Sequence, residues 1–188
     1  MEDEELMNAV CKGEHAAYQQ LVKAHLPSIS KYAYRIMGNQ SETNDITQET
    51  FIKLWVNAER WDPKKSKLTT WLHRITHNLC IDHLRKWRKS KFSENFEEDI
   101  ADQELTRDNE IESNELNDKI QDLLIALRTL PESQRSALAL CHYSGFSNKE
   151  AASIMNISVK ALESAISRAK RSLRKTLMNA PNNENDKA

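Results

Sequence analysis

The sequence predicts an all-α protein made of two small helical domains joined by a flexible acidic linker. Its 188 residues include only three glycines and four prolines. Apolar residues recur at helical spacing, with little of the alternation that is typical of strands. No apolar run reaches the roughly 18 residues that a membrane span needs. The first residues, MEDEEL, are acidic, whereas a secretory signal starts with basic residues, so a cytoplasmic protein is expected.

The charges are segregated, although the net charge is only −1. Residues 60–91 hold ten Lys or Arg against two acids, residues 92–118 hold eleven acids against one base, and residues 128–175 hold nine bases against three acids. Two basic blocks around an acidic stretch indicate two anion-binding modules, although solvated helix faces can also differ in charge. We therefore expect a domain over 1–91, a linker over 92–118, a second domain over 119–180 and a disordered tail over 181–188.

Helical patterning fills the first domain from residue 4 to about residue 89, with breaks expected at Gly13, Pro27 and Gly38. The segment NDITQETFIKLWVNAER carries two stripes. One is apolar at helical spacing and is expected in the core: Phe51, Leu54, Trp55 and Ala58. The other mixes acids, Gln and aliphatic residues, and suits docking on the helices of another protein: Asp45, Gln48, Glu49, Ile52 and Val56. Core packing of Ile52 and Val56 is the alternative.

The next helix is expected to begin at Thr69 or Thr70 and to run to about Lys89. One of its faces is apolar, the opposite face carries Arg and Asn, and two histidines lie at the border. The preceding loop, RWDPKKSKLTT, is basic and contains an aromatic residue. Such a loop beside an Arg/Asn face could hold single-stranded DNA by stacking and charge. The candidate DNA-binding residues are Trp61, Lys64, Lys65, Lys67, Arg74, His77, Asn78, Arg85 and Arg88.

The C-terminal block predicts a helix-turn-helix. The segment LPESQRSALALCHYSG predicts a helix between its proline and its glycine. Ser147 and Glu150 have the spacing of a capping box, which starts a short helix. Ser158 can cap the helix that follows, Val159–Leu177. Two helices joined by such a short turn are typical of DNA-binding domains.

The last helix has two distinct faces. Its apolar face is expected to pack on the domain: Leu162, Ala165, Ile166, Ala169, Leu173 and Leu177. Its polar face has short donors near the start and bases toward the end, which suits base edges and phosphates in a major groove. An ordinary amphipathic surface helix is the alternative. The candidate reading residues are Lys160, Glu163, Ser164, Ser167, Arg168 and Arg171.

The stretch HRITHNLCIDH has the composition of a metal site. His73, His77 and Cys80 lie at i, i+4 and i+7 of a helix, so they could share one face. Asp82 lies nearly opposite, and no H-E-x-x-H pattern occurs. A metal enzyme is therefore the weakest of the alternatives, and we expect no metal, no cofactor and no catalytic residue. Free thiols rather than a disulfide framework are expected at Cys11, Cys80 and Cys141.

Three segments taken together resemble the extracytoplasmic-function (group IV) sigma factors of the sigma-70 family. They are DITQETFIKLW, WDPKKSKLTTWLHRITHNLCIDHLRK and LRTLPESQRSALALCHYSGFSNKEAASIMNISVKALESAISRAKRSL. The resemblance implies a sigma-2 domain, a sigma-4 domain and no catalysis. It implies an alternative sigma factor that binds the β and β′ subunits of core RNA polymerase, recognises −10 and −35 promoter elements and stabilises the opened strand. An anti-sigma factor is a further implied partner.

The resemblance also implies residue roles. Asp45, Gln48, Glu49 and Ile52 would dock on the clamp helices of β′, and the C-terminal domain on the β flap. The loop over residues 61–70 would trap a flipped base of the −10 element beside Arg74 and Asn78. The −35 element would be read by Glu163, Ser164, Ser167 and Arg168. The chain departs from many relatives in having an acid at 163, histidines at 73 and 77, and no glycine in the loop.

A helix-turn-helix regulator that is not a polymerase subunit is the other reading of the C-terminal block. Such a regulator needs a sensing or receiver domain, and a receiver domain alternates strands with helices. The N-terminal half shows no such alternation, so the sigma factor is favoured.

Overall fold

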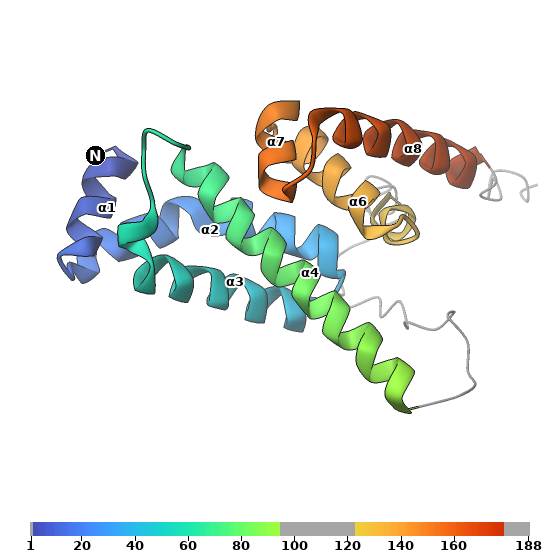
Figure 1. Ribbon diagram of the computed structural model, residues 1–188. Coiled ribbons are helices and arrows are strands. Elements are labelled where there is room, and N and C mark those ends of the chain that lie inside the picture. Colours follow the sequence, from blue (N-terminus) through green and yellow to red (C-terminus); the bar gives the residue numbers. More distant parts are fainter. Residues whose placement is uncertain (1, 95–122, 179–188) are drawn as a thin grey trace, which may run out of the picture.

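The computed structural model describes residues 2–94 and 123–178 (Figure 1). No strand occurs within these two ranges, so the predicted all-α class is confirmed there. None of the helices in this part of the chain is long and apolar enough to cross a lipid bilayer. The elements are α1 Asp3–Cys11, α2 His15–Met37, α3 Gln40–Val56, the 3-10 helix η1 Ala58–Arg60, α4 Leu68–Glu94, α6 Glu132–Leu138, the π-helix η2 Ala139–Tyr143, α7 Asn148–Met155 and α8 Val159–Met178.

Helices α1 to α4 form the N-terminal bundle, with α2 in contact with α1, α3 and α4 (Figure 1). Three leucines from α2, α3 and α4, namely Leu21, Leu54 and Leu72, are wholly buried in its core. The predicted stripe packs there too, since Phe51 of α3 and Ala58 of η1 are buried and Trp55 of α3 is half-buried. The apolar periodicity of the sequence therefore sets the inward face of the bundle.

Two of the three expected breaks are helix ends, and the third is not. Gly13 and Gly38 have positive φ angles of 85° and 82°, which a side chain would disfavour. Pro27, by contrast, lies inside the continuous helix α2, so the break predicted there is wrong. Proline removes one backbone donor. Because Pro27 is exposed on the outer side of α2, water can satisfy the freed carbonyl, and the buried face of the helix holds α2 together across it.

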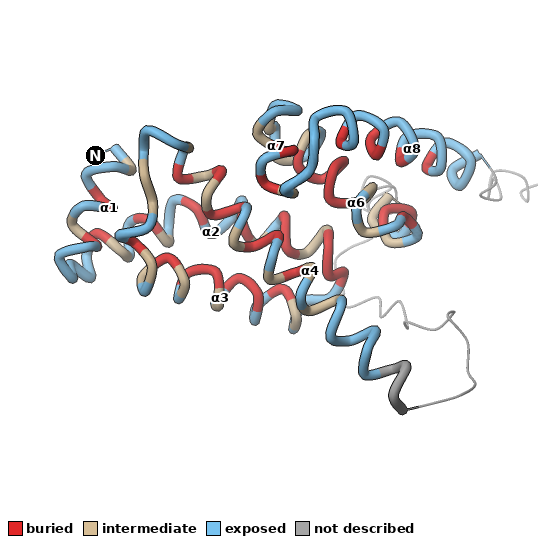
Figure 2. Tube along the Cα trace, in the orientation of Figure 1, coloured by how far each residue is buried: buried red, intermediate tan, exposed pale blue. Residues whose placement is uncertain are grey.

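The C-terminal domain consists of residues 123–130, α6, η2, α7 and α8. The single helix predicted between Pro131 and Gly145 is instead α6 followed by a π-helical segment. The apolar face predicted for α8 is buried from Leu162 to Leu173, whereas Leu177 is 49% exposed near the end of the helix. The prediction that Leu177 packs on the domain is therefore wrong, because the helix extends beyond the surface that it packs against (Figure 2).

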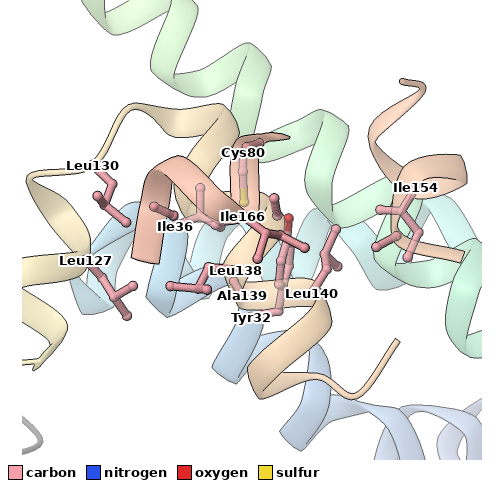
Figure 3. Packing of buried hydrophobic residues seen from close by; sticks show 14 of the residues in the cluster. Tyr32, Ile36, Cys80, Leu127, Leu130, Leu138, Ala139, Leu140, Ile154 and Ile166 are labelled. Carbon is pink, nitrogen blue, oxygen red and sulfur yellow. The ribbon is translucent and has the colours of Figure 1, made fainter. Parts of the chain in front are cut away.

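The two domains share one hydrophobic core. Tyr32, Ile36 and Cys80 of the N-terminal bundle lie in the same cluster as Leu140 and Ile166 of the C-terminal domain (Figure 3). Helix α4 contacts α7, and α2 contacts α6 and η2. The C-terminal half of α4 projects beyond this packing and is exposed over residues 85–90 (Figure 2). The linker beyond residue 94 and the tail over 181–188 lie outside the described residues.

Candidate functional site

The outer face of α3 is a candidate protein-docking surface. Ile52 is 46% exposed and Val56 is 71% exposed, so the alternative that both residues are core is wrong. Asp45 and Gln48 are also exposed, and Glu49 forms an ion pair with Lys53 at 3.4 Å. We name this set of five predicted residues the α3 face: Asp45, Gln48, Glu49, Ile52 and Val56.

The orientation of the α3 face is fixed by what α3 buries on its other side. The Asn39 side chain accepts a hydrogen bond from the Glu42 backbone N–H at 2.8 Å and so starts the helix. Thr50 is buried, and its hydroxyl donates to the Ile46 carbonyl at 2.8 Å and lies 3.2 Å from the Thr76 hydroxyl of α4. Buried threonines with internal hydrogen bonds bring α3 close to α4, and the α3 face is left outward.

The basic loop before α4 is tied down by its own polar groups. The Trp61 indole N–H donates to the Ser66 carbonyl at 3.1 Å, and the half-buried ring packs against the N-terminal core. The Asp62 carboxylate accepts the Lys64 backbone N–H at 3.0 Å. Lys64 and Lys65 are exposed at the tip of the loop. Trp61 therefore shapes the loop, while the lysines present positive charge to solvent.

The predicted DNA-binding face of α4 is only partly free. Arg74, Asn78, Arg85 and Arg88 are exposed. Arg74 and Asn78, however, line a hollow of about 320 Å³ whose other wall is α7. His77 is only 6% exposed, so in this conformation its side chain is not available to DNA, in contrast to its predicted role.

Two histidines of α4 are buried, and one of them, His73, meets Phe146 of the C-terminal domain. Nδ1 of His77 is 2.9 Å from the Tyr32 hydroxyl. Nδ1 of His73 is 2.8 Å from the Thr69 carbonyl, and its Nε2 is buried without a hydrogen-bond partner. Burial lowers the pKa of each histidine from 6.5 to about 4, since a charged imidazolium would lose its hydration. Both rings are therefore neutral near pH 7.

Burial also settles the chemistry open to Cys80. The Cys80 thiol is wholly buried, and burial raises its pKa to about 12. It therefore stays protonated and unreactive at neutral pH. Within residues 2–94 and 123–178, no three His, Cys, Asp or Glu side chains are placed to hold a metal ion together. In HRITHNLCIDH, therefore, His73, His77 and Cys80 are buried, whereas Arg74, Asn78 and Asp82 are exposed. The three cysteines are free thiols.

The neutral histidines predict a pH dependence of stability. Lowering the pH from 7 to 5 is expected to reduce the free energy of unfolding by roughly 2–4 kcal/mol for the pair. The folded pKa values of about 4 lie below the unfolded value of 6.5, so stability is full above pH 6.5 and is lost as the pH falls toward 4. The measurement is urea unfolding at pH 7 and pH 5. The His77→Gln variant should lose only about half as much free energy of unfolding between these pH values as wild type. The control His142→Gln, at an exposed site, should lose as much as wild type. Equal pH dependence in both variants would contradict the assignment.

The helix-turn-helix has the caps that the sequence predicts. The Ser147 hydroxyl accepts the Glu150 backbone N–H, and the Glu150 carboxylate accepts the Ser147 backbone N–H, which completes the capping box of α7. The Ser158 hydroxyl accepts the Ala161 backbone N–H at 3.1 Å at the start of α8. Between the two helices, Asn156 adopts a left-handed conformation with φ 54°. Asparagine tolerates this better than other side chains, so the turn can be tight.

The polar face of α8 is entirely exposed. We name its six predicted residues the α8 face, and each of them is exposed: Lys160, Glu163, Ser164, Ser167, Arg168 and Arg171. Asn148 of α7 donates to the Glu163 carboxylate at 3.3 Å. Leu162 and Ala169 lie on the opposite side of α8 and are wholly buried. The arrangement presents a rigid helix with short polar groups near its start and guanidiniums farther along.

The residues that join the two domains were not among the sequence predictions. Glu132, Glu150 and Ser153 each contact a cation of the N-terminal bundle, and Arg135 donates to the Ile36 carbonyl at 2.6 Å. None of these contacts follows from spacing, because the partners are 44 to 99 residues apart along the chain.

Two family models match the chain, Sigma-70 region 2 over residues 21–90 and Sigma-70 region 4 over residues 120–173. The chain is 32% identical to the ECF RNA polymerase sigma factor SigW of Bacillus subtilis, over 89% of this chain and 92% of that protein. It is 31% identical to the RNA polymerase sigma factor NccH of Alcaligenes xylosoxydans, over 91% and 92% of the two chains.

The fold is similar to solved structures. The sigma factor RpoE in complex with the anti-sigma factor NepR from Bartonella quintana matches with a TM-score of 0.68 and 25% identity, covering 87% of this chain and 98% of that one. CnrH in complex with the cytosolic domain of CnrY matches with a TM-score of 0.70 and 23% identity, covering 95% and 99%. The second likeness shows a common fold alone.

Proposed function

The chain belongs to the extracytoplasmic-function sigma factors of the sigma-70 family, and from that premise we propose how its surfaces divide the work of promoter recognition. A sigma factor of this family is a transcription initiation factor: it binds core RNA polymerase and directs initiation at specific promoters. The chain carries both a region 2 and a region 4. We assign one polymerase-docking surface and two DNA-binding surfaces to described residues.

The α3 face is the proposed docking surface for the clamp helices of the β′ subunit. Its support is the exposure of Ile52 and Val56 beside exposed Asp45 and Gln48 on a helix whose other side is fully packed. Exposed aliphatic residues among acids suit a partner surface with apolar and basic groups. The C-terminal domain is proposed to dock on the β flap, as the family resemblance implies.

The basic loop and the outer face of α4 are the proposed surface for the −10 element. Lys64 and Lys65 would attract the backbone of the opened strand, and Arg74 and Asn78 would contact bases or phosphates. Lys67, Arg85 and Arg88 extend this cationic surface. Trp61 and the buried His77 support it from beneath, so we propose no direct DNA contact for His77.

We propose that the α8 face reads the −35 element. The outward exposure of its six polar residues on a well-packed helix supports this assignment. A capped helix-turn-helix holds α8 by Leu162 and Ala169 while all six polar residues face outward. In a major groove, Glu163 can accept a hydrogen bond from a cytosine or adenine amino group, and Arg168 can donate to guanine or phosphate.

Membership of the family disfavours the two rival functions. A regulator that is not a polymerase subunit does not account for the match to Sigma-70 region 2 over residues 21–90. A metal enzyme would need ligands where Cys80 and His77 are instead buried in packing. We propose that the chain has no catalytic activity of its own and acts in the cytoplasm with the polymerase.

An anti-sigma factor is a further proposed partner. The solved relative from Bartonella quintana is a sigma factor in complex with the anti-sigma factor NepR. Its chain is 25% identical to this one and is covered over 98% of its length. We propose that a comparable inhibitor binds this chain as well.

Glu163 is expected to set the base preference at one position of the −35 element. Replacing Glu163 with Gln should relax discrimination there by about 1–3 kcal/mol, because an amide can donate as well as accept. Selection of promoter sequences from a randomised pool with the holoenzyme measures this. Glu59→Gln, at an exposed site on η1, is the matched control and should leave the selected sequences unchanged. Identical −35 preferences for Glu163→Gln and wild type would refute the assignment.

A further inference from the structure

A hollow of about 550 Å³ lies between α2, the loop before α4 and the segment that follows η2. This volume is in the range of roughly 300–1,000 Å³ that is usual for small-molecule sites. The N-terminal bundle lines the hollow with residues of α2 between 24 and 35, with Lys67 and with the first turns of α4. The C-terminal domain lines it with residues 143–146 and Glu150. Each domain therefore supplies one wall.

The lining of the hollow has an excess of positive charge. Three cations, Lys31, Arg35 and Lys67, line it together with a single carboxylate, that of Glu150. The Glu150 carboxylate is already engaged, because it lies 3.5 Å from the Lys67 ammonium and accepts the Ser147 backbone N–H at 3.0 Å. A hollow with this balance of charge favours an anionic ligand over a neutral or cationic one.

Two of the three cations have no acidic partner in the described part of the chain. Within residues 2–94 and 123–178, neither Lys31 nor Arg35 forms an ion pair with an Asp or Glu side chain. They lie one turn apart on α2, so their head groups can act on the same ligand. Arg35 is half-buried, and burial lowers the pKa of its guanidinium. An anion in the hollow would offset the hydration that this guanidinium has lost.

The Arg35 guanidinium is held in position by the π-helical segment η2. Its Cζ atom lies 4.6 Å from the centroid of the ring of Tyr143, the last residue of η2. Stacking on an aromatic ring orients a guanidinium and leaves the N–H groups at its edge free to donate. Nη1 donates to the Lys31 carbonyl at 3.5 Å, and a guanidinium has five N–H donors. Arg35 is therefore oriented by the opposite domain and keeps donors for an anion.

We propose that this hollow binds a small organic molecule that carries a diphosphate group, with the phosphate oxygens on Lys31, Arg35 and Lys67. A diphosphate brings at least two negative charges and several acceptor oxygens, which suit one guanidinium and two ammonium groups. Pro27 and Phe146 add apolar lining that suits the organic part of the molecule. Of these residues, only Lys67 also belongs to the proposed −10 surface, so the site lies beyond the surfaces assigned to promoter recognition.

Isothermal titration calorimetry on the full chain tests the ligand class, with ADP, inorganic pyrophosphate and adenosine as probes in a buffer without divalent cations. ADP and pyrophosphate should bind at one site, and adenosine should not bind. ADP should bind at least about threefold more tightly than pyrophosphate, because its organic part adds apolar contact. Absence of ADP binding up to about 1 mM, or equal affinities for ADP and adenosine, would overturn the proposal. Equal affinities for ADP and pyrophosphate would overturn the assignment to an organic molecule.

Lys31→Glu tests the wall on α2. It removes a cation and adds a charge of the same sign as the ligand, so ADP affinity should fall at least about tenfold. The matched control is Lys23→Glu, the same change at an exposed site of α2 that does not line the hollow. Salt screens a charge at that distance from the ligand, so the control should bind ADP within about twofold of wild type. Equal losses in the two variants would indicate a general effect of charge and would overturn the site.

Ser144→Glu tests the wall from the C-terminal domain. Ser144 lines the hollow, so a carboxylate there should also weaken ADP binding at least about tenfold. Ser172→Glu, at an exposed site of α8 outside the hollow, is its control and should bind as wild type does. Loss of binding with Lys31→Glu but not with Ser144→Glu would place ADP on α2 alone and would contradict a site with two walls.

Ala24→Trp tests the space itself without a change of charge. Ala24 is exposed on α2 and lines the hollow, so an indole there should fill the space and abolish ADP binding. Unchanged ADP affinity in this variant would place the ligand elsewhere on the chain. Circular dichroism and thermal unfolding check that each variant is folded. The titrations use neither polymerase nor promoter, so the site can fail while the chain still directs transcription.

Discussion

Replacing Ile52 with Glu is expected to weaken binding of core RNA polymerase at least about 30-fold, which corresponds to about 2 kcal/mol. Ile52 is the aliphatic residue near the middle of the α3 face, and 46% of it is exposed in the free chain. A carboxylate at a contact that becomes buried would lose its hydration without gaining a partner. The acids already present in this face, Asp45 and Glu49, would add repulsion.

The matched control for this prediction is Leu26→Glu. Leu26 is 42% exposed on α2 and lies outside the α3 face, so the same chemical change there should leave polymerase binding intact. Affinity is measured by fluorescence titration of labelled sigma factor with core enzyme. Thermal midpoints of both variants should match wild type, since neither position is in a core. Equal binding by Ile52→Glu and Leu26→Glu would remove the α3 face from the polymerase contact.

Replacing Leu162 with Ala is expected to lower the free energy of unfolding by about 2–5 kcal/mol. Leu162 is wholly buried and lies in the shared core with Leu140 and Ile154. Its removal leaves a cavity beneath the start of α8, where Glu163 and Ser164 are presented. Duplex promoter binding should therefore fall together with stability, because the reading residues lose their rigid support.

The control for Leu162 is Leu177→Ala, on the same helix. Leu177 is 49% exposed, so its truncation should change stability by no more than about 0.5 kcal/mol. Urea unfolding followed by circular dichroism measures both variants. A loss below about 1 kcal/mol for Leu162→Ala would mean that the core beneath α8 rearranges to fill the space, and that α8 is held mainly by other contacts.

Sequence patterns predicted those features that depend on residues close together in the chain, namely helix caps and helix faces. The capping box of Ser147 and Glu150 involves residues three apart, so spacing alone identifies it. The buried and exposed faces of α3 and α8 follow from helical periodicity, and burial of Leu54 and Leu162 matches it. Periodicity did not decide whether Ile52 is buried, because its burial depends on which helices pack beside α3.

The features that the sequence did not reveal depend on distant partners. His73 and His77 lie at the border of the α4 faces, and only the placement of Tyr32 and Phe146 decides that both are buried. The π-helical segment η2 lies where the chain contacts α2, and no residue type in it signals that geometry. Pro27 is tolerated within α2 because it lies on the exposed side of the helix. The rule that proline breaks a helix does not consider which side of the helix the proline occupies.

Packing of the two domains also changes how the charge pattern is interpreted. Segregated charge indicated two anion-binding modules, and the α8 face agrees with that expectation through its exposed Lys160 and Arg171. On the proposed −10 surface, however, Arg74 of α4 and Lys67 of the preceding loop already have partners within the chain. These cations therefore take part in domain packing in the free chain. Ion pairs near a surface are exchanged at low cost, so this packing is compatible with the DNA binding that we propose for them.

Run-off transcription with sigma-free core RNA polymerase decides whether the chain directs promoter-specific initiation through these surfaces. The template is the promoter of the operon that encodes this chain. We expect a discrete transcript that requires the chain, is nearly abolished by Ile52→Glu, and is retained with Leu26→Glu. Absence of any chain-dependent transcript, on this template and on fragmented genomic DNA, would contradict the assignment of these surfaces to promoter-specific initiation.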